Sequence, residues 1–99
     1  MAILRLFEFT TIPFLSAPDT ADQCRKKLEQ MLVFHKKVEI DFSNVYVTQG
    51  FLTHLFDPLV KEKGNKIFDR LFFANCTQAT EFNLGQMIKA YNQQAISSE

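Results

Sequence analysis

The sequence predicts an α/β domain in which short strands alternate with amphipathic helices. Residues 38–42 alternate strictly between apolar and polar side chains, a pattern that is typical of a strand. Residues 21–32 and 51–60 instead repeat their apolar side chains every three or four positions, as helices with one buried face do. Strands that are separated by helices favour parallel pairing through right-handed crossovers.

The composition indicates one folded domain with an aromatic core. Of the 99 residues, 46% are apolar and 11 are phenylalanine, which is too much apolar surface for a disordered chain. A chain of this length can bury one core but not two, so we expect residues 1–99 to form a single domain. The polar residues 92–99 predict a tail that frays.

The N-terminal part is expected to contain a strand, a second short strand and a helix. Residues 3–9 are rich in large apolar side chains that alternate imperfectly, which predicts a strand. Residues 12–15 predict a short strand that Pro13 restricts to a sheet edge. Only this N-terminal strand or hairpin is free to run antiparallel. The first helix is expected to start near Thr20, which forms a capping-box pattern with Gln23.

The middle of the chain predicts a strand, a turn and a helix. The strand at residues 38–42 leads into Ser43 and Asn44, which are turn residues, and residues 45–47 are again extended. Thr48 then offers a side-chain oxygen that caps the second helix.

The C-terminal part is expected to add a strand and a last helix. Pro58 predicts a kink in the second helix, and Gly64 is expected to end it. The apolar run at residues 71–74 suits a central strand that is covered on both faces. Thr77 or Thr80 is expected to cap the last helix. Its predicted buried face consists of Ala79, Phe82, Met87, Ile88 and Tyr91.

The expected element order is therefore β-(β)-α-β-α-β-α. We expect a mixed, mostly parallel sheet of about four strands, packed with about three helices.

Charge and cysteine content argue against several classes of protein. The 11 basic and 11 acidic side chains cancel, whereas proteins that bind nucleic acids usually carry a basic excess. No apolar run approaches the ~20 residues that span a bilayer, and the first residues lack the pattern of a secretory signal. Cys24 and Cys76 belong to no metal-ligand or redox motif, so we expect free thiols, no metal and a cytoplasmic location.

Little in the sequence predicts catalysis or a cofactor. The common nucleotide-binding and hydrolase motifs are absent. Asp41 ends a strand at the carboxyl edge of the sheet, where α/β proteins place their sites, but no second acid, base or nucleophile accompanies it. We expect Asp41 to accept hydrogen bonds from the turn at residues 43–45. His54 is expected on the exposed side of the second helix. A nucleophilic Cys–His pair is kept as an alternative hypothesis.

Residues 38–60, VEIDFSNVYVTQGFLTHLFDPLV, resemble the signature of the STAS-like domain family of unknown function. The shared features are an apolar strand that ends in Asp-Phe, a short turn, and an amphipathic helix. The flanking segments agree, since a helix with charged outer positions precedes this stretch and an apolar strand follows it.

The resemblance implies a fold like that of the anti-sigma-factor antagonists. In that group, the loop between strand and helix docks onto a kinase of the histidine-kinase-like ATPase type, and phosphorylation of a hydroxyl at the helix start breaks the complex. A dianionic phosphate at a contact surface carries a large desolvation cost. In this chain Gly50 occupies the position of the usual serine, which leaves Thr48 and Ser43 as candidates for phosphorylation.

We therefore expect a non-enzymatic regulatory module that docks a protein, with a histidine-kinase-like ATPase as the candidate partner. No cofactor, nucleic acid or membrane is expected to bind. The alternative is a small-molecule or nucleotide-binding domain that uses the same carboxyl-edge loops, and an enzyme with an unrecognised site is a third hypothesis. The expected partner-binding residues are Ser43, Asn44, Thr48, Gln49, Gly50 and His54.

Overall fold

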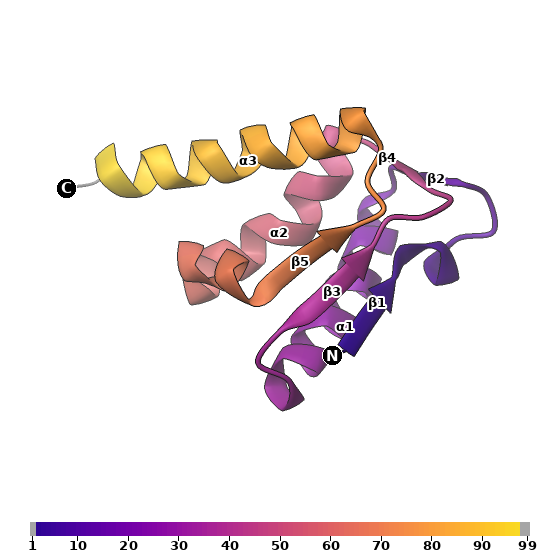
Figure 1. Cartoon of the computed structure of the whole chain (residues 1–99), viewed down its shortest axis with the longest axis horizontal. Coiled ribbons are helices and arrows are strands. Elements are labelled where there is room, and N and C mark those ends of the chain that lie inside the picture. Colours follow the sequence, from indigo (N-terminus) through magenta and orange to yellow (C-terminus); the bar gives the residue numbers. More distant parts are fainter. Residues whose placement is uncertain (1, 98–99) are drawn as a thin grey trace.

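Strands and helices alternate along residues 2–97, the part of the chain that the computed structural model describes; side chains are described up to residue 93. This arrangement confirms the α/β class (Figure 1). In chain order the elements are β1 (Ala2–Arg5), the 3-10 helix η1 (Leu6–Phe9), β2 (Phe14–Leu15), α1 (Pro18–Phe34), β3 (Val38–Asp41), β4 (Tyr46–Val47), α2 (Gln49–Lys63), the 3-10 helix η2 (Asn65–Arg70), β5 (Leu71–Ala74) and α3 (Gln78–Ser97).

The strands form two separate parallel sheets. One has three strands in the order β1-β3-β5, and the other consists of β2 and β4. The expected four-stranded mixed sheet is thus only roughly matched, and the N-terminal strands run parallel to their partners. The division arises after β3, where Asn44 adopts a left-handed conformation with φ 61° and turns the chain away from the larger sheet.

Strand β1 is shorter than the predicted strand at residues 3–9. It pairs with β3 from Ala2 opposite Val38 to Arg5 opposite Asp41, and the chain then enters η1. The imperfect alternation of this stretch reflects that change, because the 3-10 helix turns its side chains away from the two-residue period of a strand.

Strand β5 lies at an edge, so the prediction of a central strand at residues 71–74 was wrong. β5 pairs with β3 on one side, and β3 occupies the centre of the sheet. Leu71 is buried, but Phe72 on the opposite face is 43% exposed. An apolar run predicts that a strand is buried, but it does not show whether other strands or helices cover it.

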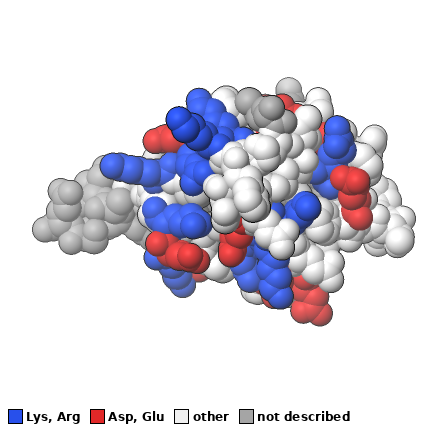
Figure 2. Space-filling model, turned by 90° about the horizontal axis from the view of Figure 1, so that it is seen from below, with Lys and Arg blue, Asp and Glu red and all other residues white. Residues whose placement is uncertain are grey.

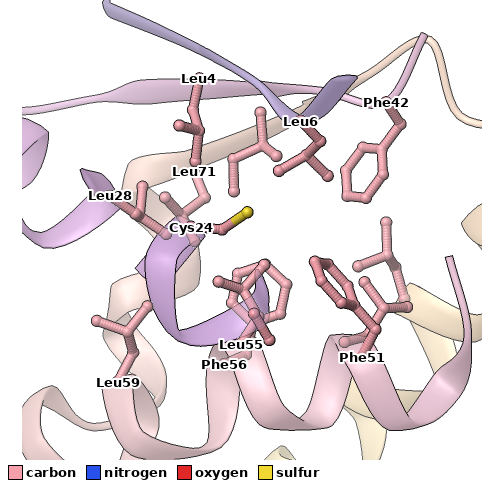
Figure 3. Close-up of a cluster of buried hydrophobic side chains, with 14 of the residues drawn as sticks. Leu4, Leu6, Cys24, Leu28, Phe42, Phe51, Leu55, Phe56, Leu59 and Leu71 are labelled. Carbon is pink, nitrogen blue, oxygen red and sulfur yellow. The ribbon is translucent and has the colours of Figure 1, made fainter. Parts of the chain in front are cut away.

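Helices α1 and α2 cover one face of the three-stranded sheet and confirm the two predicted apolar stripes (Figures 1 and 3). The strands contribute Leu4, Val38, Ile40 and Leu71 to this core, whereas Ile3 on the other face is 38% exposed. The buried helical residues are Ala21, Cys24, Leu28 and Leu32 of α1 and Phe51, Leu52, Leu55, Phe56 and Leu59 of α2.

Helix α1 starts at Pro18, before the predicted capping box. Ala17 occupies the N-cap position without a side-chain hydrogen bond, and Pro18 lies in the first turn. Proline suits this position because its missing N–H would have no partner there and its φ angle is already helical. The expected pairing of Thr20 with Gln23 at the helix start was therefore wrong.

Helix α3 matches its predicted buried face only in part. Thr77 caps it, since its Oγ1 accepts a hydrogen bond from the N–H of Thr80 at 3.1 Å. Thr80, Leu84 and Met87 are buried, but Phe82 is 65% exposed. Of the predicted face, Met87 is buried, Ile88 and Tyr91 are half-buried, and Ala79 is exposed like Phe82.

The predicted frayed tail overlaps the end of α3. The helix continues to Ser97, so residues 92–97 have helical backbone, and residues 98–99 lie outside the described residues. Fraying of this segment stays a prediction.

Candidate partner-binding surface

Asp41, Ser43 and Asn75 form a hydrogen-bonded cluster at the carboxyl edge of β3 and β5. Oδ1 of Asp41 accepts hydrogen bonds from the N–H of Ser43 at 2.9 Å and from Nδ2 of Asn75 at 2.9 Å, and the Ser43 hydroxyl donates to the same oxygen. These bonds, first that of Asn75, hold the pKa of Asp41 below its usual range. The cluster confirms the expected role of Asp41 in fixing the turn.

Two asparagines in left-handed conformation shape the neighbouring turns. Asn44 has φ 61° and Asn75 has φ 58°, a region that asparagine tolerates better than most residues. Asn75 directs the chain from β5 towards α3 while its side chain reaches Asp41. Both asparagines border a hollow of about 410 Å³, which Tyr46 and Thr77 also line.

The start of α2 carries the cap predicted from the sequence. Oγ1 of Thr48 accepts a hydrogen bond from the N–H of Phe51 at 3.0 Å. Gly50 is exposed, and a Cβ built on it would lie 4.0 Å from Oγ1 of Thr48, which is an ordinary contact. Its φ angle is not in the left-handed region. A serine therefore fits at position 50 without steric or backbone strain.

The predicted partner-binding residues lie in separate groups. Ser43 and Asn44 belong to the turn after β3, whereas Thr48, Gln49 and Gly50 form the first turn of α2. Strand β4 connects the groups, and no hydrogen bond joins them in the part of the chain with described side chains.

His54 lies one turn farther along α2, with an exposed side chain. Its carbonyl oxygen accepts a hydrogen bond from Nη1 of Arg25 at 3.3 Å, which links α2 to α1. The structure thus places His54 in α2, outside both the turn after β3 and the first turn of the helix.

An exposed aromatic pair lies beside these residues and was not predicted. Phe14 and Tyr46 are paired in register between β2 and β4, so both side chains project from the same face of the small sheet. Phe14 is 51% exposed and Tyr46 is 62% exposed, and the nearby Ile12 is 61% exposed. Pro13 followed by Phe14 was the only local sign of this feature in the sequence. It could not show that β2 pairs with β4 and so brings Phe14 beside Tyr46.

Charges of both signs lie beside one another on the face shown in Figure 2. Several are paired locally along the helices. Arg25 contacts Asp22 at 2.8 Å and Glu29 at 3.4 Å within α1, and Lys61 contacts Asp57 at 2.9 Å within α2.

The two cysteines are weak nucleophiles in this fold. Burial raises the pKa of Cys24 to about 12, and Figure 3 shows its sulfur within the core. Burial and the charge of Glu81 also raise the pKa of Cys76. Since the thiolate is the reactive form, neither side chain is activated. No hydrogen bond from either cysteine to a histidine occurs within residues 2–93.

No group of three His, Cys, Asp or Glu side chains among the described residues is placed to hold a metal ion. No helix of residues 2–97 combines the length and the apolar character needed to cross a membrane.

Comparison with known proteins identifies the family. The family model described as "STAS-like domain of unknown function (DUF4325)" matches residues 21–81, which extend from the first turns of α1 to the start of α3. No curated protein and no solved structure matches the chain significantly. Because the family match covers more than half of the sequence, the chain belongs to the family of STAS-like domains of unknown function.

Proposed function

We propose that this domain is a non-enzymatic regulatory module that docks a partner protein through a carboxyl-edge surface. We define this surface by Ile12, Phe14, Ser43, Asn44, Tyr46 and the α2 start at Thr48, Gln49 and Gly50. The exposed pair of Phe14 and Tyr46 carries the proposal. Aromatic residues bury roughly 150–250 Å² each and are enriched at the centres of protein interfaces.

The surroundings of the aromatic pair support this proposal. Ser43, Asn44 and Gln49 supply polar groups around it, as the rim of an interface requires. Asp41 and Asn75 hold the turn in one conformation before any partner binds. A preformed surface loses less conformational entropy on binding than a flexible loop does.

A histidine-kinase-like ATPase is the partner class that we propose, and this part rests on the family's relation to anti-sigma-factor antagonists. We place the encounter in the cytoplasm, where thiols such as Cys24 and Cys76 remain reduced. Both candidate phosphorylation sites already use their hydroxyls, Thr48 as the cap of α2 and Ser43 as a donor to Asp41. A phosphate on Ser43 would lie beside the Asp41 carboxylate and be repelled by it.

A second candidate function is supported by the hollow of about 410 Å³ beside Asn44, Tyr46, Asn75 and Thr77. Its size falls within the range of small-molecule sites, about 300–1,000 Å³. A small polar ligand or nucleotide that binds there would raise the unfolding temperature of the free domain and protect Tyr46 from surface labelling. A protein partner without a small ligand would raise the temperature only when the partner itself is added.

The docking proposal is tested with Tyr46→Ser and a matched control. Phe34→Ser removes an aromatic side chain that is 82% exposed at the other end of the molecule, at the end of α1. The partner is isolated with the tagged wild-type chain, purified, and titrated against each variant. We expect Tyr46→Ser to weaken binding at least about tenfold, or about 1.4 kcal/mol. Unchanged binding of Tyr46→Ser would remove the aromatic pair from the interface.

Substitutions at Gly50 test the start of α2. Gly50→Arg adds a large cation to the proposed surface, and equal retention of the partner by this variant and wild type would exclude Gly50 from the contact. Gly50→Ser restores a hydroxyl at the position used for switching in the related group. After incubation with ATP and the partner kinase, mass spectrometry shows whether phosphate is added at position 50, at Thr48 or at Ser43.

A further inference from the structure

The outer edge of β5 has main-chain groups without partners. In a parallel sheet, alternate residues direct both their N–H and their C=O to the same neighbouring strand. The carbonyl oxygen of Ala74 accepts a hydrogen bond from Phe42 N–H at 2.9 Å, so Ala74 and Phe72 face β3. Phe73 therefore directs its N–H and C=O away from the sheet, and no hydrogen bond reaches them from the described residues.

A groove of about 520 Å³ runs along this edge. Residues of β5 line one side and residues of α3 line the other. The space beside Gly85 on the α3 side is open, because a Cβ built on this residue would meet no atom within 4 Å. The apolar part of the lining consists of Leu71, Phe72, Phe73, Leu84, Gly85 and Ile88.

The edge also lacks the features that usually prevent strand pairing. Natural edge strands are commonly protected by a charged residue, a proline or a bulge. The four residues of β5 are Leu, Phe, Phe and Ala, and none of them is charged or is proline. Lys37 covers the ring of Phe72, with Nζ 5.1 Å from the ring centroid, but this contact lies on the sheet face and leaves the edge open.

The charge in the groove indicates what kind of segment fits. Glu81 is the one charged side chain among the lining residues, and no salt bridge to it occurs within residues 2–93. Its negative potential reaches Cys76, whose pKa it helps to raise. A segment with a Lys or Arg side chain near Glu81 is electrostatically complementary to the groove.

We propose that the groove between β5 and α3 binds an extended, apolar peptide segment with a basic residue, which belongs to a partner protein and adds to β5 as a further strand. The segment hydrogen-bonds to the N–H and C=O of Phe73 and places its cation beside Glu81. A single extended segment suits the site because α3 bounds its far side, whereas a strand of a second folded copy would bring its own flanking elements. This inference does not depend on the carboxyl-edge surface.

The test begins with a displayed library of random peptides, selected on the wild-type domain and counter-selected on Gly85→Leu. The leucine side chain fills the groove, whereas Gly85→Ala adds one methyl group that meets no neighbour and serves as the matched control. We expect enriched peptides with alternating apolar residues and a Lys or Arg. They should bind Gly85→Ala like wild type, Glu81→Gln several-fold more weakly, and Gly85→Leu at least tenfold more weakly.

Amide hydrogen exchange of the wild-type domain then tests the strand addition itself, independently of how the variants fold. A saturating enriched peptide is expected to slow exchange of the Phe73 amide at least tenfold and to leave Phe72, which already bonds to β3, unchanged. A selection that enriches no peptide on wild type over Gly85→Leu overturns the proposal. A bound peptide that leaves Phe73 exchange unchanged overturns it as well.

Discussion

Helices α2 and α3 both flank β5, but they are attached to the domain in different ways. Phe56 of α2 packs edge-on against Phe73 with 5.9 Å between ring centroids, and five side chains of α2 are almost inaccessible. The part of α3 with described side chains buries Thr80, Leu84 and Met87 and leaves Phe82 at 65% exposure. Helix α2 is thus part of the core and fixes the carboxyl-edge surface, whereas α3 leaves the edge of β5 open.

The largest expected effect is the loss of core packing in α2. Phe56→Ala removes a ring that contacts both Phe68 and Phe73, with 5.9 Å between centroids in each pair. We expect the free energy of unfolding to fall by about 3–5 kcal/mol, measured by urea denaturation. Phe82→Ala, the same substitution on α3, should change it by less than about 0.5 kcal/mol. Similar losses in the two variants would contradict the difference between the helices.

The next effect concerns the turn after β3, which Asp41 and Asn75 hold in place. Asp41→Ala removes the acceptor of the hydrogen bonds from Ser43 and Asn75, which should cost about 1.5–3 kcal/mol at neutral pH. Because the folded-state pKa of Asp41 is lowered, its contribution is complete above the unfolded-state value of about 3.9 and is lost as the pH falls through the folded-state value.

Urea denaturation of wild type and Asp41→Ala at a series of acidic pH values checks this prediction. The difference between the two proteins should shrink as the pH falls. A difference that stays constant down to the lowest pH would show that the carboxylate charge does not stabilise the turn.

A smaller effect is expected where α3 is tied to α2. The hydroxyl of Tyr91 donates a hydrogen bond to Oδ1 of Asp57 at 3.1 Å, and burial together with this bond raises the pKa of Tyr91 to about 12. Tyr91→Phe should cost about 0.5–1.5 kcal/mol. The contribution is complete below the unfolded-state pKa of about 10 and is lost as the pH rises through about 12. Thermal unfolding at neutral and alkaline pH measures it, and an equal cost at both would rule out the neutral hydroxyl as its source.

The smallest effect has the opposite sign. Gly85→Ala on the exposed face of α3 should stabilise the domain by about 0.5–1 kcal/mol, because alanine loses less backbone entropy than glycine in a helix. Differential scanning calorimetry detects this as a raised unfolding temperature. A lowered temperature would mean that α3 packs against Gly85 more closely than the open space around it indicates.

Several parts of the fold that local patterns determine were predicted correctly, although the start of α1 was not. The alternation around Val38 and Ile40 correctly predicted β3. Thr48 and Gly64 correctly predicted where α2 begins and ends. Long-range pairing was not predictable in the same way. The apolar residues of β5 do not show whether the strand is central or at an edge, so the exposure of Phe72 depends on where β5 lies in the sheet.

In the candidate site, too, local contacts were predictable from the sequence and long-range contacts were not. The acceptor role of Asp41 towards Ser43 follows from a common turn pattern within three residues. Asn75 completes the cluster from a distant strand, and Phe14 reaches Tyr46 only because β2 pairs with β4. Both contacts depend on the order of strands in space, which the sequence of elements alone does not determine.

The most direct test of the docking surface is photo-cross-linking in cells that contain the natural partner. Benzoylphenylalanine replaces Tyr46 in one variant and Phe34 in a control, since both positions carry exposed aromatic rings. We expect one discrete adduct from position 46 that contains the same protein isolated with the wild-type chain, and no such adduct from position 34. A partner adduct from position 34 but none from position 46 would contradict it.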